Sequence, residues 1–107
     1  MSGSFGDMGN ILRQAQEMQR ELDKAREALR KTSVEGTAGG GAVRVTVTGD
    51  RHVTSVEISA EIVSAADKGM LEDLVLAAVR DGLEQAAKLE KESLGRVTGG
   101  MDLPGLF

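Results

Sequence analysis

The sequence predicts a single α+β domain: a long helix, a three-stranded antiparallel sheet, a short helical turn and a second long helix. Apolar residues recur in alternating steps of three and four in the first third of the chain, as on one side of a helix. In the middle of the chain, valines alternate with polar residues, as in a strand with one buried face. At 107 residues we expect one domain over 1–107, with a tail over 99–107.

The first long helix is predicted from Met8 to Lys31, because its apolar seam repeats every seven residues and its other positions favour helix. Asp7 is placed to cap this helix, and residues 1–7 are expected to be flexible. A helix of roughly 36 Å is longer than a sheet of three short strands can cover. Part of the seam must therefore meet another helix, in this chain or in a second copy. The seam consists of Met8, Ile11, Ala15, Met18, Leu22, Ala25 and Leu29.

Three strands are predicted over residues 33–38, 42–48 and 51–58. Gly39–Gly41 and Gly49-Asp50 are turn signals between them. Two closely spaced turns imply an antiparallel meander with one apolar face. That face is expected to hold Val43, Val45 and Val47 of the second strand and Thr54, Val56 and Ile58 of the third.

A short helical turn capped by Ser59 follows, and a second long helix is predicted over about residues 68–98, capped by Ser64 or Asp67 and stopped by Gly99-Gly100. The first half of this helix is apolar nearly all the way round, which is typical of a helix buried on more than one side. One small sheet covers only one side. We therefore predict a homodimer with helical arms projecting from a sheet-and-helix body, dimerised through Leu71, Leu74, Val75 and Val79.

Composition argues against catalysis, metals and cofactors. The chain has no cysteine, one histidine, two phenylalanines and no tryptophan or tyrosine. His52 is therefore interpreted as a surface histidine, and Glu72 and Asp73 as solubilising charge, since no nucleophile–base arrangement or metal-ligand cluster accompanies them. No signal peptide or membrane-spanning stretch is evident, so we expect neither a membrane partner nor a small-molecule substrate.

Basic residues form a line along the first helix, although the formal net charge of the chain is −4. Their spacing of 7, 4 and 7 residues places them within about 20° of one line on a helix. Such a stripe suits the phosphate backbone of duplex DNA, which requires positive charge in register. The same pattern is also expected of a solvated helix face. The stripe consists of Arg13, Arg20, Lys24 and Lys31.

Two further arginines could extend a phosphate-contacting surface from the helix onto the sheet. Arg44 is expected on the polar face of the second strand, and Arg51 beside the hairpin turn. Charge at these positions is also the ordinary protection of strand edges against aggregation, and we favour that interpretation.

Several short segments form a pattern across nearly the whole chain: Gly9-Asn10, Arg13–Gln16, Met18-Gln19, Val43–Val47, Val56–Ile58, Met70–Val75, Ala77-Ala78 and Gly100–Gly105. No single segment is specific, but the combination resembles the YbaB/EbfC family of bacterial nucleoid-associated proteins. The resemblance implies a tweezers-shaped dimer with helical arms and sequence-tolerant binding of double-stranded DNA. It also implies a place at the nucleoid in the bacterial cytoplasm, with effects on nucleoid organisation or gene expression.

Two functions are therefore carried forward. The favoured one is a homodimeric, double-stranded-DNA-binding protein whose basic stripe contacts phosphates. The alternative is a protein-interaction module in which the helical arms grip a protein partner. Its adaptable apolar contacts would be the seam, including Met8 and Met18, together with residues 103–107. The net negative charge favours this alternative.

Overall fold

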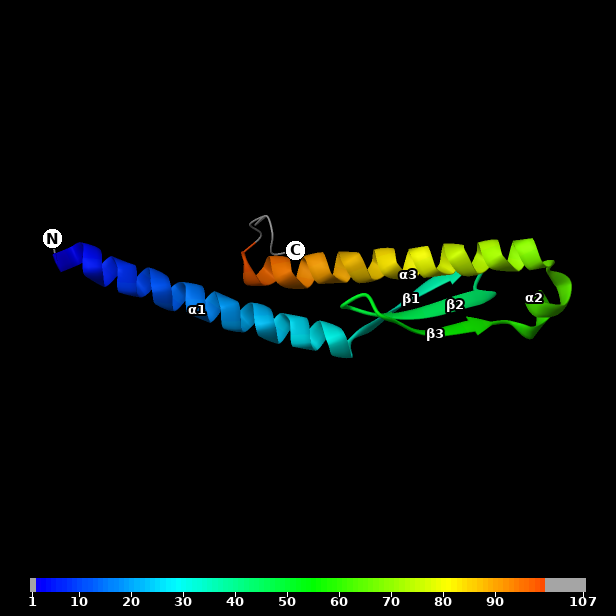
Figure 1. Cartoon of the computed structure of the whole chain (residues 1–107), viewed down its shortest axis with the longest axis horizontal. Helices are drawn as coiled ribbons and strands as arrows, with labels where there is room; N and C mark the ends of the chain where they lie inside the picture. The colour runs from blue at the N-terminus through cyan, green and yellow to red at the C-terminus, as the bar shows by residue number, and fades with distance from the viewer. Residues whose placement is uncertain (1, 100–107) are drawn as a thin grey trace.

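The computed structural model describes residues 2–99, with side chains from Asp7 onward. It has the predicted order of elements, which lie in an elongated body of 77 × 21 × 16 Å (Figure 1). The α+β architecture is thereby confirmed. The elements are α1 (Ser2–Lys31), β1 (Ser33–Ala38), β2 (Val43–Thr48), β3 (Val53–Ile58), α2 (Ala60–Ala65) and α3 (Lys68–Val97).

The sheet is an antiparallel meander in the order β1-β2-β3. Its inner face is built by β2, where Val43, Val45 and Val47 are fully buried and alternate with polar residues. The loop between β1 and β2 contains three glycines with positive φ, as the glycine-rich turn predicts. The third strand begins at Val53 rather than Arg51, because Arg51 adopts a left-handed conformation with φ of 68° and belongs to the turn.

A bulge changes which residues of β3 share the inner face of the sheet. Val56 pairs with Val45 and Ser55 with Thr46, but the next pairing joins Val53 to Val47, so Thr54 is the extra residue. The expectation that Thr54 lies on the apolar face is therefore wrong. Directly opposed residues of an antiparallel pair point to the same side, so the inner positions of β3 are Val53, Val56 and Ile58.

The helix α3 packs on β1 and β2 through its residues from Leu74 to Ala86. Asp67 caps it, since Asp67 Oδ1 accepts a hydrogen bond from the Met70 N–H at 2.7 Å. The predicted cap of α2 is also present, because Ser59 Oγ accepts a hydrogen bond from the Ile62 N–H at 3.3 Å. The helix ends at Val97, where Gly99 follows with a φ of 67°.

Two glycines bring α3 unusually close to β1. A Cβ atom added at Gly36 would lie 2.1 Å from the Gly82 nitrogen and 2.3 Å from the Ala78 carbonyl oxygen. Gly36 and Gly82 are both buried at this crossing. The backbones therefore meet without side chains between them. This close approach brings the valines of β2 into contact with α3: a Cβ added at Gly82 would lie 2.7 Å from Val47 Cγ2.

The helix α1 begins at Ser2, earlier than the predicted start at Met8. Asp7 lies inside the helix, so the prediction that it caps the N-terminus is wrong, and residues 2–7 continue the helix. The other end agrees with the prediction, because α1 stops at Lys31, and the Thr32 hydroxyl donates to the Ala28 carbonyl at 2.9 Å. Apart from Gly99, the predicted tail 99–107 lies outside the described residues.

The second halves of α1 and α3 pack side by side in opposite directions, beyond one end of the sheet (Figure 1). Leu22, Leu29 and Leu94 are at most 3% exposed and form a cluster of their own, separate from the valine core. Part of the seam thus meets another helix of the same chain, as the length of the first helix requires. The first half of α1 runs past the end of α3, and no other element formed by residues 2–99 lies beside it (Figure 1).

We predict that the Gly36–Gly82 contact tolerates no added methyl group. Gly36→Ala should lower the free energy of unfolding by about 3 kcal/mol or more, since its Cβ meets backbone atoms. Gly82→Ala should cost about 1–3 kcal/mol, because overpacking against Val47 is partly offset by better helix propensity. Urea unfolding at one fixed protein concentration measures both. Gly95→Ala, in the same helix with open space around it, is the control and should be neutral or stabilising.

A carboxylate of α3 holds the edge strand β1. Asp81 Oδ2 accepts a hydrogen bond from the Thr37 N–H at 2.9 Å, and this bond is the main cause that lowers the pKa of Asp81 below its ordinary value. Gln85 donates to the other oxygen at 3.4 Å and acts in the same direction.

We predict that Asp81→Asn destabilises the protein at pH 7 and that the deficit disappears in acid. A lowered folded-state pKa contributes stability that is fully present above the unfolded value of about 3.9 and is lost as the pH falls through the folded value. Denaturation midpoints from pH 7 to pH 2.5 should therefore converge for the variant and the parent. The exposed Asp73 of the same helix supplies the control, Asp73→Asn. A deficit that stays constant over this range would contradict the assignment.

Candidate nucleic-acid interface

The rotation of α1 about its axis is fixed by its packing on α3. Leu22 and Leu29 are buried against Leu94, with Met18 and Ala25 beside them. At 100° per residue, these positions lie within about 60° of one another on the helix. The side that carries the basic stripe is therefore turned away from α3 and toward solvent. The four stripe residues Arg13, Arg20, Lys24 and Lys31 are all exposed.

The stripe cations make only weak contacts with the protein itself. Lys24 Nζ lies 3.4 Å from Glu21 and Lys31 Nζ lies 3.9 Å from Glu27, with both lysine side chains about three-quarters exposed. Exposed pairs of this kind stabilise a protein by only about 0–1 kcal/mol, so a stronger anion can displace them.

The two arginines of the stripe are freer still. Arg13 donates to Asn10 Oδ1 at 2.9 Å, which leaves its charge uncompensated. Within residues 7–99, no ion pair involves Arg13 or Arg20.

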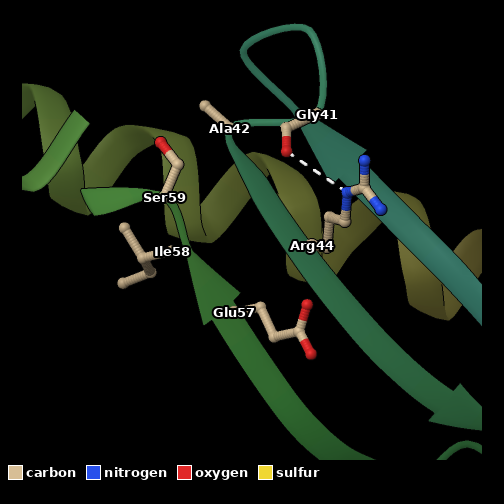
Figure 2. A pocket seen from close by; sticks show the side chains of 6 residues that line it. All are labelled: Gly41, Ala42, Arg44, Glu57, Ile58 and Ser59. Atoms are coloured by element: carbon tan, nitrogen blue, oxygen red, sulfur yellow. Dashed lines mark hydrogen bonds between the residues drawn. The ribbon is translucent and has the colours of Figure 1, made fainter. Parts of the chain in front are cut away.

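The arginines of the sheet do not extend this stripe. Arg44 Nε donates to the Gly41 carbonyl at 3.3 Å beside a shallow pocket, and Glu57 is its pairing partner on the neighbouring strand (Figure 2). Glu57 thus lies on the same face of the sheet as Arg44, although the two side chains form no ion pair within the described residues. Arg51 forms an ion pair with Glu90 of α3. Arg44 lies on the central strand and Arg51 in the β2–β3 turn, so the favoured interpretation that these charges protect strand edges is wrong.

The other titratable residues considered as functional candidates have local contacts and no catalytic or metal-binding arrangement in the described part of the chain. His52 is exposed in the β2–β3 turn, with Nδ1 3.0 Å from Asp50 Oδ2. The pKa of Asp50 is lowered, first by the Thr48 hydroxyl and then by His52. Across the described part of the chain, no group of three His, Cys, Asp or Glu side chains could hold a metal ion, and no helix is long and apolar enough to cross a membrane.

An apolar groove lies on the side of α3 next to β3. Because α3 is centred over β1 and β2, it leaves the inner face of β3 open: Val53 is 44% exposed and Val56 is 45% exposed. Sequence reasoning placed Val56 on the apolar face but missed Val53, since the bulge that aligns Val53 with Val47 leaves no periodic signal. The groove itself is lined by Ile58, Leu71, Glu72, Val75, Leu76 and Val79.

The four residues predicted to form a dimer interface do not all share this groove. Leu71, Val75 and Val79 line it together. Leu74 faces the other side of α3, where its Cδ2 lies 3.2 Å from a Cβ position built at Gly39 of the β1–β2 loop. All four are half-buried, and Leu74, Val75 and Val79 also pack on the valine core. Leu76, which is 48% exposed, lies at the groove and was not predicted.

These features define a class: small α+β proteins in which a three-stranded sheet carries a projecting two-helix arm with an exposed basic side. Residues 5–101 of the chain match the YbaB/EbfC DNA-binding family, and the chain belongs to that family. The resemblance noted in the sequence is thereby confirmed, and this family is defined by DNA binding rather than by a reaction.

Bacterial relatives match along nearly their whole length. A nucleoid-associated protein of Alkaliphilus metalliredigens is 43% identical over 105 residues, covering 98% of this chain and 92% of that protein. A nucleoid-associated protein of Exiguobacterium sp. is 49% identical over 101 residues, covering 94% and 96%. The crystal structure of an uncharacterized protein from Helicobacter pylori has the same fold, with a TM-score of 0.71 at 22% identity, covering 89% of this chain and 97% of the other.

Proposed function

We propose that this protein is a nucleoid-associated homodimer that binds double-stranded DNA with little sequence preference, through the basic stripe of α1. The observation that carries the proposal is the position of the stripe. The same packing that buries Leu22 and Leu29 against α3 turns all four stripe cations to solvent. Membership of a DNA-binding family and the names of the relatives support it.

The dimensions of the stripe suit a DNA backbone. From Arg13 to Lys31 the helix rises roughly 27 Å, at about 1.5 Å per residue. That length corresponds to about eight base pairs, at about 3.4 Å per step along one strand. Lysine and arginine contacts to phosphate oxygens position a protein on DNA without reading bases, so binding of this kind tolerates many sequences. Local compaction of DNA, with effects on gene expression, is the role that follows.

A second copy of the chain is the proposed occupant of the apolar groove. Ile58, Leu71, Val75, Leu76 and Val79 present a nearly unbroken apolar surface between β3 and α3. An isologous dimer through this surface places the same groove from each copy in contact and covers the open valines of β3. The groove lies on the body and the stripe on the arm, so each dimer carries two separate stripes.

We predict that charge reversal on the stripe weakens binding to every duplex alike. Arg20→Glu with Lys24→Glu replaces two phosphate contacts by repulsion, and each lost contact reduces the slope of log affinity against log salt by about 0.9. At about 0.1 M salt, affinity should fall by at least about tenfold. Fluorescence anisotropy of a labelled 30-base-pair duplex, titrated at several salt concentrations and with two unrelated sequences, measures both quantities.

The matched control for this experiment is Lys88→Glu with Lys91→Glu. Both lysines are exposed and lie on the second half of α3, and the change in net charge is identical. If this control loses as much affinity as the stripe variant, binding depends on overall charge and the stripe has no special role. If neither variant loses affinity, the DNA contact lies elsewhere.

We predict that Leu76→Asp shifts the protein toward monomer by at least about tenfold in dissociation constant, because it buries a charge in the proposed dimer interface. Leu76 is 48% exposed in the single chain, so the fold itself should survive. Sedimentation equilibrium over a range of concentrations measures the shift, and circular dichroism checks the fold. Ala77→Asp, at the neighbouring residue of α3 that is exposed and does not line the groove, is the control. An unchanged dimer in the Leu76 variant would remove the groove from the interface.

A further inference from the structure

The first half of α1 presents an apolar surface that no described element covers. Met8, Ile11 and Leu12 are 61–63% exposed, and Ala15 beside them is also exposed. Met8, Ile11 and Ala15 belong to the seam whose later positions are buried against α3. We refer to the surface made by Met8, Ile11, Leu12 and Ala15 as the tip surface. It lies on the opposite side of α1 from the basic stripe.

The helix at the tip surface has weak intrinsic support. Three glycines, Gly3, Gly6 and Gly9, fall within its first eight residues, and glycine is the poorest helix former after proline. Most helical stability in proteins comes from packing of an apolar side rather than from propensity. A cover on its apolar side would stabilise a helix of this composition.

We infer that residues 101–107 of the same chain are that cover, binding along the tip surface from its base at Met18 toward Met8. The segment begins at the right place. Val97, at the end of α3, packs with Met18 against the leucine cluster, and these two residues line one groove with Gln14, Glu17, Glu21 and Arg96. Gly99 lines an adjoining groove that shares Arg96 with the first, so the described chain ends close to Met18 at the base of the tip surface.

The segment has the required length and chemistry. From Met18 to Met8 the helix rises about 15 Å. Eight residues from Gly100 to Phe107 span up to about 26 Å when extended, so the reach is ample. Four of them are large and apolar, and Pro104-Gly105 prevents helix formation, which favours an extended segment laid along the helix. These four are Met101, Leu103, Leu106 and Phe107.

The size of the tip surface selects a tethered occupant over a separate molecule. Four side chains are far fewer than the about 20–30 residues a side of a stable protein–protein interface. A separate protein partner or the arm of another copy would therefore bind weakly through this surface alone. A segment joined by one glycine acts at an effective concentration in the millimolar range, which suffices for a small contact.

Amide hydrogen exchange tests the inference without DNA, so its outcome does not depend on the proposed DNA binding. Ending the chain after Gly100 should speed exchange of amides 11–17 by about fivefold, while amides 20–31 stay unchanged. Leu103→Ser with Leu106→Ser and Phe107→Ser, at full length, should have the same effect. Asp102→Asn is the control and should change nothing. Unchanged exchange in both the shortened and the triple variant would overturn the inference.

A spin label distinguishes the possible occupants in the full-length chain. The sequence has no cysteine, so Gln14→Cys provides a single attachment point beside the tip surface. The label should broaden the amide signals of residues 103–107 in the same molecule. Mixing labelled protein with isotope-enriched unlabelled protein should produce no such broadening. Broadening only in the mixture, or protection of amides 11–17 that rises with protein concentration, would assign the tip surface to a second copy and overturn the inference.

Discussion

Gly36 and Gly82 bring a strand and a helix together backbone to backbone, and this contact determines where α3 lies on the sheet. A helix held that close to β1 covers β1 and β2 and leaves the inner face of β3 uncovered. Because α3 is one continuous helix of 30 residues, its second half passes beyond the sheet and becomes the surface on which α1 packs. The open groove and the projecting arm are thus consequences of the same constraint.

Acidic and basic residues are distributed unequally between the body and the arm of the protein. Residues 59–92 hold eight acidic and four basic side chains, whereas residues 8–32 hold four acidic and six basic ones. Exposed charges separated by more than about 8 Å are largely screened at physiological salt. An anion at the outer side of α1 therefore experiences the nearby cations of the stripe far more than the distant acidic residues of the body. A net charge of −4 is compatible with a phosphate-binding arm for this reason.

The sequence predicts most of the fold, because period and turn chemistry are local properties. The seam of α1, the alternating valines of β2 and the caps at Ser59 and Asp67 were all readable from spacing. The errors occur where local pattern carries no information. The bulge at Thr54 depends on pairing with β2, and residues 2–7 are helical despite three glycines in the first nine positions.

The candidate site also has one part that could be predicted from the sequence and one part that could not. The stripe follows from helical period, so its four residues could be named from the sequence, and the structure exposes all of them. The side of α3 that each apolar residue occupies depends on the Gly36–Gly82 contact, which periodicity does not reveal. Leu74 was therefore grouped with Leu71, Val75 and Val79, although it faces the β1–β2 loop.

The C-terminal end of α1 is attached rigidly to the sheet, which determines how the arm responds to force. The Gly49 N–H donates to the Leu29 carbonyl at 2.9 Å, and a Cβ at Gly49 would lie 2.7 Å from that same oxygen. The last turn of the helix is thus clamped on the β2–β3 turn, with no flexible linker between arm and body. A rod of roughly 45 Å, held only along its final half, acts as a lever. Sideways load at its free end reaches the sheet as torque, so the stiffness of the sheet sets how far the arm can be deflected.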